Sequence, residues 1–298
     1  MFTVRNISFV PRAFAALVVA FLFIAAVRVA TVPVTAGGDQ KMKPEELIAK
    51  HLESIGKAEA RAAVRNRIIN GVAEMTLKQG GTGSLLGSAL LASEGDKNLL
   101  MMAFNRPDYP AEKIGYNGHK LSVQAIRPGV RTPLGEFFRT HEEMFKEGLV
   151  GGTLSTSWPL LNVAARAPKL EYGGTRKFDG RPAHELKYTP KKGSSLKIKL
   201  YFDAENFRHI RTEYERVIAA TMGARPIESG GRLDTRYKVI EEYSDFKEEN
   251  GLTLPHTYRF ELQMTSDRAP VLLEWVLSLQ KFSFNQSMSG KEFDVEGG

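Results

Sequence analysis

Alternation of apolar and polar side chains with a period of two recurs along this chain and restricts the folds open to it. The clearest case is residues 196–202, which read LKIKLYF. Because successive side chains of a β-strand point to opposite faces, this segment has one face suited to water and one that needs cover. The pattern predicts a strand whose apolar side packs on another part of the chain. That side consists of Leu196, Ile198, Leu200 and Phe202.

The same pattern recurs in segments joined by short turns, such as 203–206 and 249–251, which favours antiparallel pairing of neighbours. Two further turns are predicted at 80–83 and 267–270. The segments with strand character are 69–77, 85–93, 97–104, 121–125, 184–189, 196–202, 207–216, 232–247, 252–264 and 272–284. We therefore predict a mainly β (α+β) fold that contains one antiparallel meander of about 10–11 strands.

Helical periodicity appears first at residues 44–56. Pro44 and two acidic residues open the segment, its apolar residues share one face, and Gly56 stands where a helix would end. Proline and acids at the start and glycine at the end are typical helix boundaries. The segment predicts a short amphipathic helix, and 59–64 predicts one more turn.

A second helical segment interrupts the strands at 131–165, which we call the lid region. Thr132 can cap a helix that begins at Pro133 and ends at Gly148, and Pro159 can begin a second short helix. Helices inside a long antiparallel meander must pack on one face of the sheet or fill one of its mouths. The apolar stripe that would make this contact contains Leu134, Phe137, Phe138, His141 and Phe145.

The first 36 residues have the layout of a secretory signal peptide. Arg5 and Arg12 precede an uncharged apolar run of about 15 residues, and small residues follow. We predict cleavage near Ala36, which leaves one domain at 37–298. The alternative is a retained N-terminal anchor, but Arg28 interrupts the run before the roughly 20 residues needed to span a bilayer.

Charge and cysteine content exclude several classes of protein. Cleavage would lower the formal net charge from +7 to +4, because three arginines and no acidic residue would be removed. Lysine and arginine are interspersed with acidic residues, which gives nucleic-acid binding little support. The absence of cysteine excludes disulfides and a lipid-modified cysteine, so the fold depends on core packing.

The residues that carry chemistry elsewhere form no recognisable motif here, and we predict no metal or cofactor site. The histidines lack metal-ligand spacing, and His209 and His256 are interpreted as structural residues on the surface or half-buried. The histidines are His51, His119, His141, His184, His209 and His256.

Two pairs of adjacent carboxylates, Glu142–Glu143 and Glu241–Glu242, are interpreted as solvated surface. Neighbouring residues point in different directions on a helix and to opposite faces on a strand, so neither pair forms an acid/base dyad by itself. The spacing leaves open a hydrolase that pairs distant carboxylates.

Large apolar side chains are abundant in the lid region and in several strands. Residues 99–104 are apolar on both faces, and the lid region and 272–284 add aromatic rings. One interpretation is an ordinary core between a curved sheet and its helices. The other is an apolar cavity in which methionine and phenylalanine form adaptable walls for a flexible ligand.

Several segments together resemble the LolA/LolB-like superfamily of outer-membrane lipoprotein-sorting proteins. They are the signal peptide, the amphipathic helix with ELIAKHLESIG at 46–56, LYFDAENFRHIR at 200–211, and YSDFKEENGLTLPHTYRF at 243–260. The resemblance covers nearly the whole mature chain. It implies a curved antiparallel sheet that forms an incomplete β-barrel, with a few short helices over its opening, in the bacterial periplasm.

In that superfamily the concave face and its helical lid enclose acyl chains. The resemblance therefore implies a non-enzymatic carrier for a lipid or an acylated lipoprotein, which meets donor and acceptor proteins at membranes and is a monomer. The ligand-binding residues that it implies are Met75, Leu77, Met101, Phe137, Phe138, Phe145, Trp158, Leu200, Phe202 and Trp275. The alternatives are a sensing or interaction module of the same fold that binds another envelope protein, and an envelope hydrolase.

Overall fold

A single antiparallel sheet of twelve strands dominates the computed structural model, which describes residues 42–79, 83–218, 234–265 and 270–296. The predicted signal peptide and the predicted turns at 80–83 and 267–270 lie wholly or mostly outside these residues. The strands are β1 (Asn66–Leu77), β2 (Ser84–Glu94), β3 (Lys97–Phe104), β4 (Ala111–Tyr116), β5 (Leu121–Val123), β6 (Lys169–Phe178), β7 (Arg181–Thr189), β8 (Lys197–Asp203), β9 (His209–Ile218), β10 (Thr235–Glu249), β11 (Leu252–Thr265) and β12 (Val271–Phe284).

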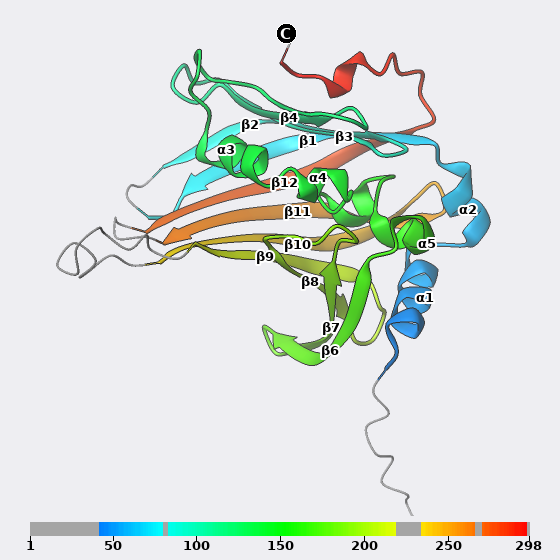
Figure 1. Ribbon diagram of the computed structural model, residues 1–298. Helices are drawn as coiled ribbons and strands as arrows, with labels where there is room; N and C mark the ends of the chain where they lie inside the picture. The colour runs from blue at the N-terminus through cyan, green and yellow to red at the C-terminus, as the bar shows by residue number, and fades with distance from the viewer. Residues whose placement is uncertain (1–41, 80–82, 219–233, 266–269, 297–298) are drawn as a thin grey trace, which may run out of the picture. The chain divides into compact units, whose positions relative to one another are not determined.

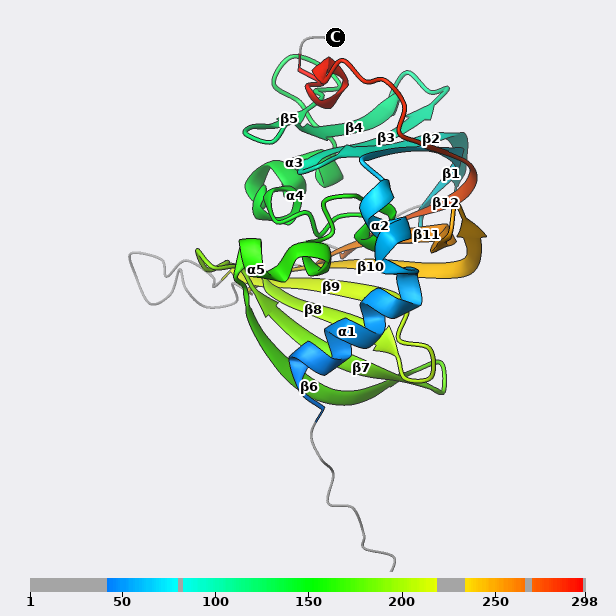
Figure 2. The same ribbon diagram turned by 90° about the vertical axis from the view of Figure 1, so that its right-hand side faces the viewer.

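The strand order is β5-β4-β3-β2-β1-β12-β11-β10-β9-β8-β7-β6, so β1 pairs with the last strand and the chain's two strand runs join there. Among the described residues β5 and β6 are the edges, and the sheet is curved but not closed (Figure 1). Figure 2 shows the curve from β5 to β6 with helices on its inner side. The predicted fold class is confirmed.

Two of the twelve strands, β4 and β6, are not among the predicted segments. β4 contains a buried glutamate and a glycine, and β6 is an edge strand that is mostly exposed, so neither shows clear alternation. Alternation in a sequence reflects the alternate burial of side chains along a strand. It is therefore weak in a strand at the edge of a sheet and in a strand that carries inward polar residues. The count is therefore twelve strands instead of 10–11.

The helices lie where the sequence predicts them, with one correction. They are α1 (Pro44–Ile55), α2 (Ala58–Ala63), α3 (Pro133–Thr140), α4 (Glu143–Lys146) and α5 (Val163–Arg166), with 3-10 turns η1 (Gly152–Leu154), η2 (Pro159–Asn162) and η3 (Lys291–Phe293). Gly56 ends α1 with a φ of +147°, as expected. Thr132 caps α3, because its hydroxyl oxygen accepts from the Gly135 N–H at 2.9 Å.

The helix predicted from Pro133 to Gly148 is broken after Thr140. His141 leaves helical geometry, with φ −122° and ψ 51°, and its buried ring lies 3.3 Å from a guanidinium nitrogen of Arg216. The ring also lies 3.7 Å from the Glu143 carboxylate. These contacts favour a turn in which the imidazole has polar neighbours over a continuous helix.

One large core fills the space between the concave face of the sheet and the helices of the lid region, with α1 at its margin. A second, smaller cluster lies on the outer face, where Phe293 of η3 packs on Leu99 and Ala92. The C-terminal segment therefore covers the back of β2 and β3. One face of β3 packs in the large core and the other packs under η3, which explains why the strand is apolar on both faces.

Candidate functional site

Four strands bring one row of inward side chains together at the centre of the concave face. Trp275 pairs with Phe260, Phe260 with Glu241, and Glu241 with Thr212. A carboxylate thus stands between an aromatic ring and a threonine, deep in an apolar surface. Burial of a carboxylate needs hydrogen-bond donors around it.

The donors for Glu241 come from the sheet and from the lid region. The hydroxyls of Tyr214 and Tyr258 donate to its two carboxylate oxygens, and the Gly151 N–H donates to Oε1 at 2.8 Å. Glu241 is 0% exposed, and burial raises the pKa of its carboxyl. Its interpretation as solvated surface is wrong, although Glu242 does point to the opposite, outer face.

The loop that supplies this donor approaches the sheet closely because it contains consecutive glycines. Gly152 has a φ of +51°, and a Cβ there would lie 2.7 Å from Nδ1 of His209 and 2.9 Å from Cζ of Tyr243. Only glycine fits such a contact in that backbone conformation. The glycines therefore allow the lid region to touch the centre of the sheet.

Two buried histidines flank Trp158 of the lid region. The Trp158 indole donates to Nε2 of His51 at 3.0 Å, so the Nδ1–H of His51 donates to the Phe207 carbonyl. The His209 ring stacks on Trp158 with centroids 4.5 Å apart. Burial lowers the pKa of His51 to about 4 and that of His209 well below its usual value.

His209 and His256 are both buried, so their predicted position on the surface or half-buried is wrong, and their structural role stays an interpretation. The alternation could not show this, because the rings that enclose His209 come from α1, the lid region and other strands. In this packed aromatic site, desolvation disfavours the charged form of His209 and lowers its pKa.

A second buried carboxylate connects β4 to the start of α3. Glu112 accepts from the Thr132 hydroxyl at 2.6 Å and from the Tyr109 hydroxyl at 2.5 Å, and Tyr109 accepts from the Trp275 indole at 3.0 Å. Burial raises the pKa of Glu112 to about 7. The cap of α3 and the sheet therefore share one hydrogen-bond network.

The predicted ligand-binding residues fall into three groups. Most are fully packed in the core: Phe137, Phe138, Phe145, Trp158, Leu200, Phe202 and Trp275. Met75 and Leu77 are half-buried at the end of β1. The inward position predicted for Met101 is wrong, because Met101 shares a face with Leu99 on the outer side of β3, and Met102 occupies the core face instead. A ligand-binding role for these residues stays a prediction.

Within the part of the chain that the structure describes, the core face is incompletely covered where the long strands end. Trp275 and Leu277 are fully buried, whereas side chains further toward the strand ends are half-buried. These side chains form a continuous apolar patch through paired strands, which we call the apolar margin. It consists of Met75, Leu77, Leu85, Met264 and Val271.

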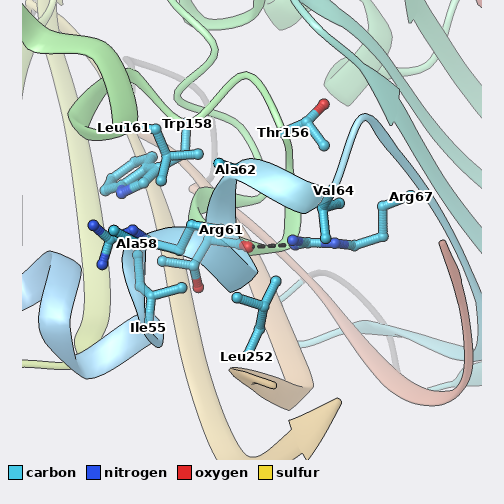
Figure 3. A pocket seen from close by; sticks show the side chains of 11 residues that line it. Ile55, Ala58, Arg61, Ala62, Val64, Arg67, Thr156, Trp158, Leu161 and Leu252 are labelled. Carbon is cyan, nitrogen blue, oxygen red and sulfur yellow. Dashed lines mark hydrogen bonds between the residues drawn. The ribbon is translucent and has the colours of Figure 1, made fainter. Parts of the chain in front are cut away.

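At the other end of β1 a cavity of about 360 Å³ lies beneath α2. Figure 3 shows Arg67 extending toward the middle of this group, whereas the side chain of Arg61 points away from Arg67; Trp158 and Leu252 are apolar walls. The sequence analysis did not predict this cavity. The one sequence feature that could have indicated it is Arg67. This cation stands two residues before the apolar Ile69, on the inward side of the same strand.

Within the part of the chain that the structure describes, no cluster of three or more histidine and carboxylate side chains could hold a metal ion. None of the described helices combines the length and the apolar character needed to cross a bilayer.

No family model matches the chain, and no curated protein matches it in sequence. Among solved structures, the chain is similar to a LolA superfamily protein from Nitrosomonas europaea, with 13% identity and a TM-score of 0.46 over 85% of this chain and 98% of that one. It is also similar to a DUF1329 family protein from Desulfovibrio piger, with 11% identity and a TM-score of 0.44 over 84% and 96% of the two chains.

A third similar structure is a putative outer membrane lipoprotein-sorting protein domain from Vibrio parahaemolyticus, with 16% identity and a TM-score of 0.41 over 83% and 97%. The first of these structures carries the name of the superfamily that the sequence resembles. At these identities the relation is one of structure only.

Proposed function

We propose that this chain is a non-enzymatic envelope protein that binds an acyl chain, of a lipid or an acylated lipoprotein, between the concave face of its sheet and the lid region. The observation that carries the proposal is the apolar margin. There the core face continues past its cover, and Met75, Leu77 and Val271 are left half-buried. An apolar chain that lay on this margin would complete the cover.

The energy of such binding comes from the hydrophobic effect. Each methylene moved from water to an apolar surface contributes about 0.8 kcal/mol. The margin leads directly to the row of Leu273, Leu262 and Val239, which is fully covered in this structure. A long chain could advance along this row only if the lid region moved away from the sheet.

The contacts of α3 with the sheet are compatible with a movement of that helix, whereas the later part of the lid region is held by the hydrogen bonds from Gly151 to Glu241 and from Trp158 to His51. Phe138 contacts Phe260 with ring centroids 5.6 Å apart, and Phe137 contacts Tyr237 at 6.0 Å. Contacts between apolar rings lack directional bonds and can be replaced by contacts with an acyl chain. We propose that α3 exchanges its aromatic contacts for those of the ligand.

Binding is better supported than catalysis. Glu241, His51 and His209 are enclosed by aromatic rings and have no exposed surface. A catalytic acid or base must reach its substrate. The predicted signal peptide implies export of the chain. Export belongs to the same proposal and would place the protein in the periplasm.

Native mass spectrometry tests the proposal on protein purified without detergent from the envelope of the producing cells. We expect an adduct of lipid mass that solvent extraction removes. The double variant Met75→Gln, Leu77→Gln should lose most of the adduct. Leu86→Gln is the matched control, because Leu86 is 69% exposed on the outer face of the adjacent strand.

A clean protein mass before extraction, or equal adducts in the double variant and the control, would contradict the proposal. A stoichiometric protein partner in place of a lipid would favour the interaction module.

A further inference from the structure

Arg67 is a buried cation without a counter-ion. Its side chain is 4% exposed, and within the described residues no carboxylate lies at ion-pair distance from it. One N–H donates to the Thr153 carbonyl at 2.6 Å, and the guanidinium lies 5.6 Å from the Phe284 ring centroid. A guanidinium has five N–H donors, and among the described residues one hydrogen bond of Arg67 is found.

Burial of this charge is costly. Desolvation lowers the pKa of Arg67 to about 10, which still leaves the group charged at neutral pH. Nε has no hydrogen-bond partner. A buried charge without a partner is one of the strongest destabilising features of a protein, and such features persist where a ligand completes them.

The surroundings of Arg67 match an anion. Thr153 and Arg67 both line the cavity beneath α2, and the Thr153 hydroxyl also has no partner. Arg61 adds a second guanidinium, which donates to the Leu52 and Gly56 carbonyls at the end of α1. The residues that line the cavity include no acid.

The remaining walls are apolar. Ile55, Val64, Trp158, Leu161 and Leu252 surround the two cations, and the volume of about 360 Å³ lies within the usual range of small-molecule sites. A hydrated inorganic ion would leave these walls unused. An anion that carries an apolar chain would use both parts of the cavity.

We propose that the cavity beneath α2 binds an anionic amphiphile, with its carboxylate or phosphate on Arg67 and Thr153 and its chain against Trp158 and Leu252. This site is separate from the apolar margin. Arg67 and Leu77 are ten positions apart on β1, which corresponds to roughly 30 Å. The inference therefore does not rest on the proposed function.

Isothermal titration calorimetry with ligands of matched chain length tests the proposal. Decanoate and decyl phosphate should bind at least tenfold more tightly than decanol, which lacks the charge. They should also bind at least tenfold more tightly than acetate and inorganic phosphate, which lack the chain. Equal affinity for decanol and decanoate, or for inorganic phosphate and decyl phosphate, would overturn the proposal.

Variants locate the site. Arg67→Met should weaken decanoate binding at least tenfold, whereas Arg65→Gln should change it less than twofold, because Arg65 is exposed two residues earlier and its loss changes the net charge equally. Ala62→Phe should block the cavity from α2, where Ala62 is exposed, and keep the fold measured by circular dichroism. Decanoate binding that is unchanged in Ala62→Phe would overturn the proposal even if Arg67→Met failed to fold.

The Met75→Gln, Leu77→Gln double variant should bind decanoate in the cavity as the parent does. A loss of decanoate binding in that variant would assign the ligand to the apolar margin and overturn the separate site.

Discussion

The two ends of β1 differ in what their side chains lack on the same face of the sheet: cover from solvent at one end and a charge partner at the other. At the end of the strand, Met75 and Leu77 are apolar and lack full cover. At its start, Arg67 is buried, and no carboxylate among the described residues is its counter-ion. Between these ends, Ala73 and Ile69 are buried in the continuous core. Side chains of the packed centre are fully covered, and among the described residues the candidate sites lie at the two ends of β1, where cover or charge is incomplete.

The largest expected effect concerns the packed centre. Phe138→Ala removes a fully buried ring that contacts Phe145 and Phe260. Truncation of a buried phenylalanine costs about 3–5 kcal/mol, so we expect a loss of this size in the free energy of unfolding by urea. Leu86→Ala on the exposed outer face should change it by less than about 0.5 kcal/mol. Equal effects would show that the ring at the centre is not packed.

Removal of the central carboxylate should have a somewhat smaller effect. Glu241→Ala leaves the hydroxyls of Tyr214 and Tyr258 and the Gly151 N–H without their acceptor. Unpaired buried donors cost about 1–3 kcal/mol each, partly offset by the lost burial of a charge, so we expect about 3 kcal/mol in the same assay. Glu242→Ala, the outward neighbour, should cost at most about 1 kcal/mol. A neutral Glu241→Ala would contradict the network.

The carboxylate at the cap of α3 should give the protein a pH dependence. Because the folded pKa of Glu112, about 7, is above the unfolded value near 4.5, stability from this group is present below about pH 4.5 and is lost as pH rises toward 7. Between pH 5 and pH 8 the loss is about 2 kcal/mol. Glu112→Gln should remove this loss, as measured by urea unfolding at both pH values. A parallel pH profile for parent and variant would exclude the assigned role.

The smallest expected effect on stability is that of Arg67→Met. The variant loses one hydrogen bond to the Thr153 carbonyl but also removes an unpaired buried cation, and these contributions oppose each other. We expect a change within about 1 kcal/mol in the urea assay. A loss of about 3 kcal/mol or more would show that Arg67 stabilises the fold as the buried core residues do. The two ends of β1 would then no longer differ in the way described above.

The sequence predicts most of this fold, because alternation and helix boundaries are local signals. Pro44 and Gly56 delimit α1, and Thr132 caps α3, as expected. The strands that it misses, β4 and β6, are those in which burial does not alternate clearly.

The site is less predictable, because its partners come from distant parts of the chain. Alternation places Glu241 and Glu242 on opposite faces, but it does not show which face is covered or that Tyr214 and Tyr258 reach the inner carboxylate. In β3 both faces are apolar, so the pattern cannot decide whether Met101 or Met102 points inward. The outer cover, Phe293, lies almost two hundred residues away.

The most direct test of the central claim is photocrosslinking with a long-chain alcohol that carries a diazirine at the end of its chain. The probe is uncharged and does not depend on Arg67. Peptide mapping by mass spectrometry should place the adducts on the core face near Met75, Met264 and Val271 and on α3. Adducts confined to the outer face around Leu86, or none above the level of unfolded protein, would contradict the binding of an acyl chain between the sheet and the lid region.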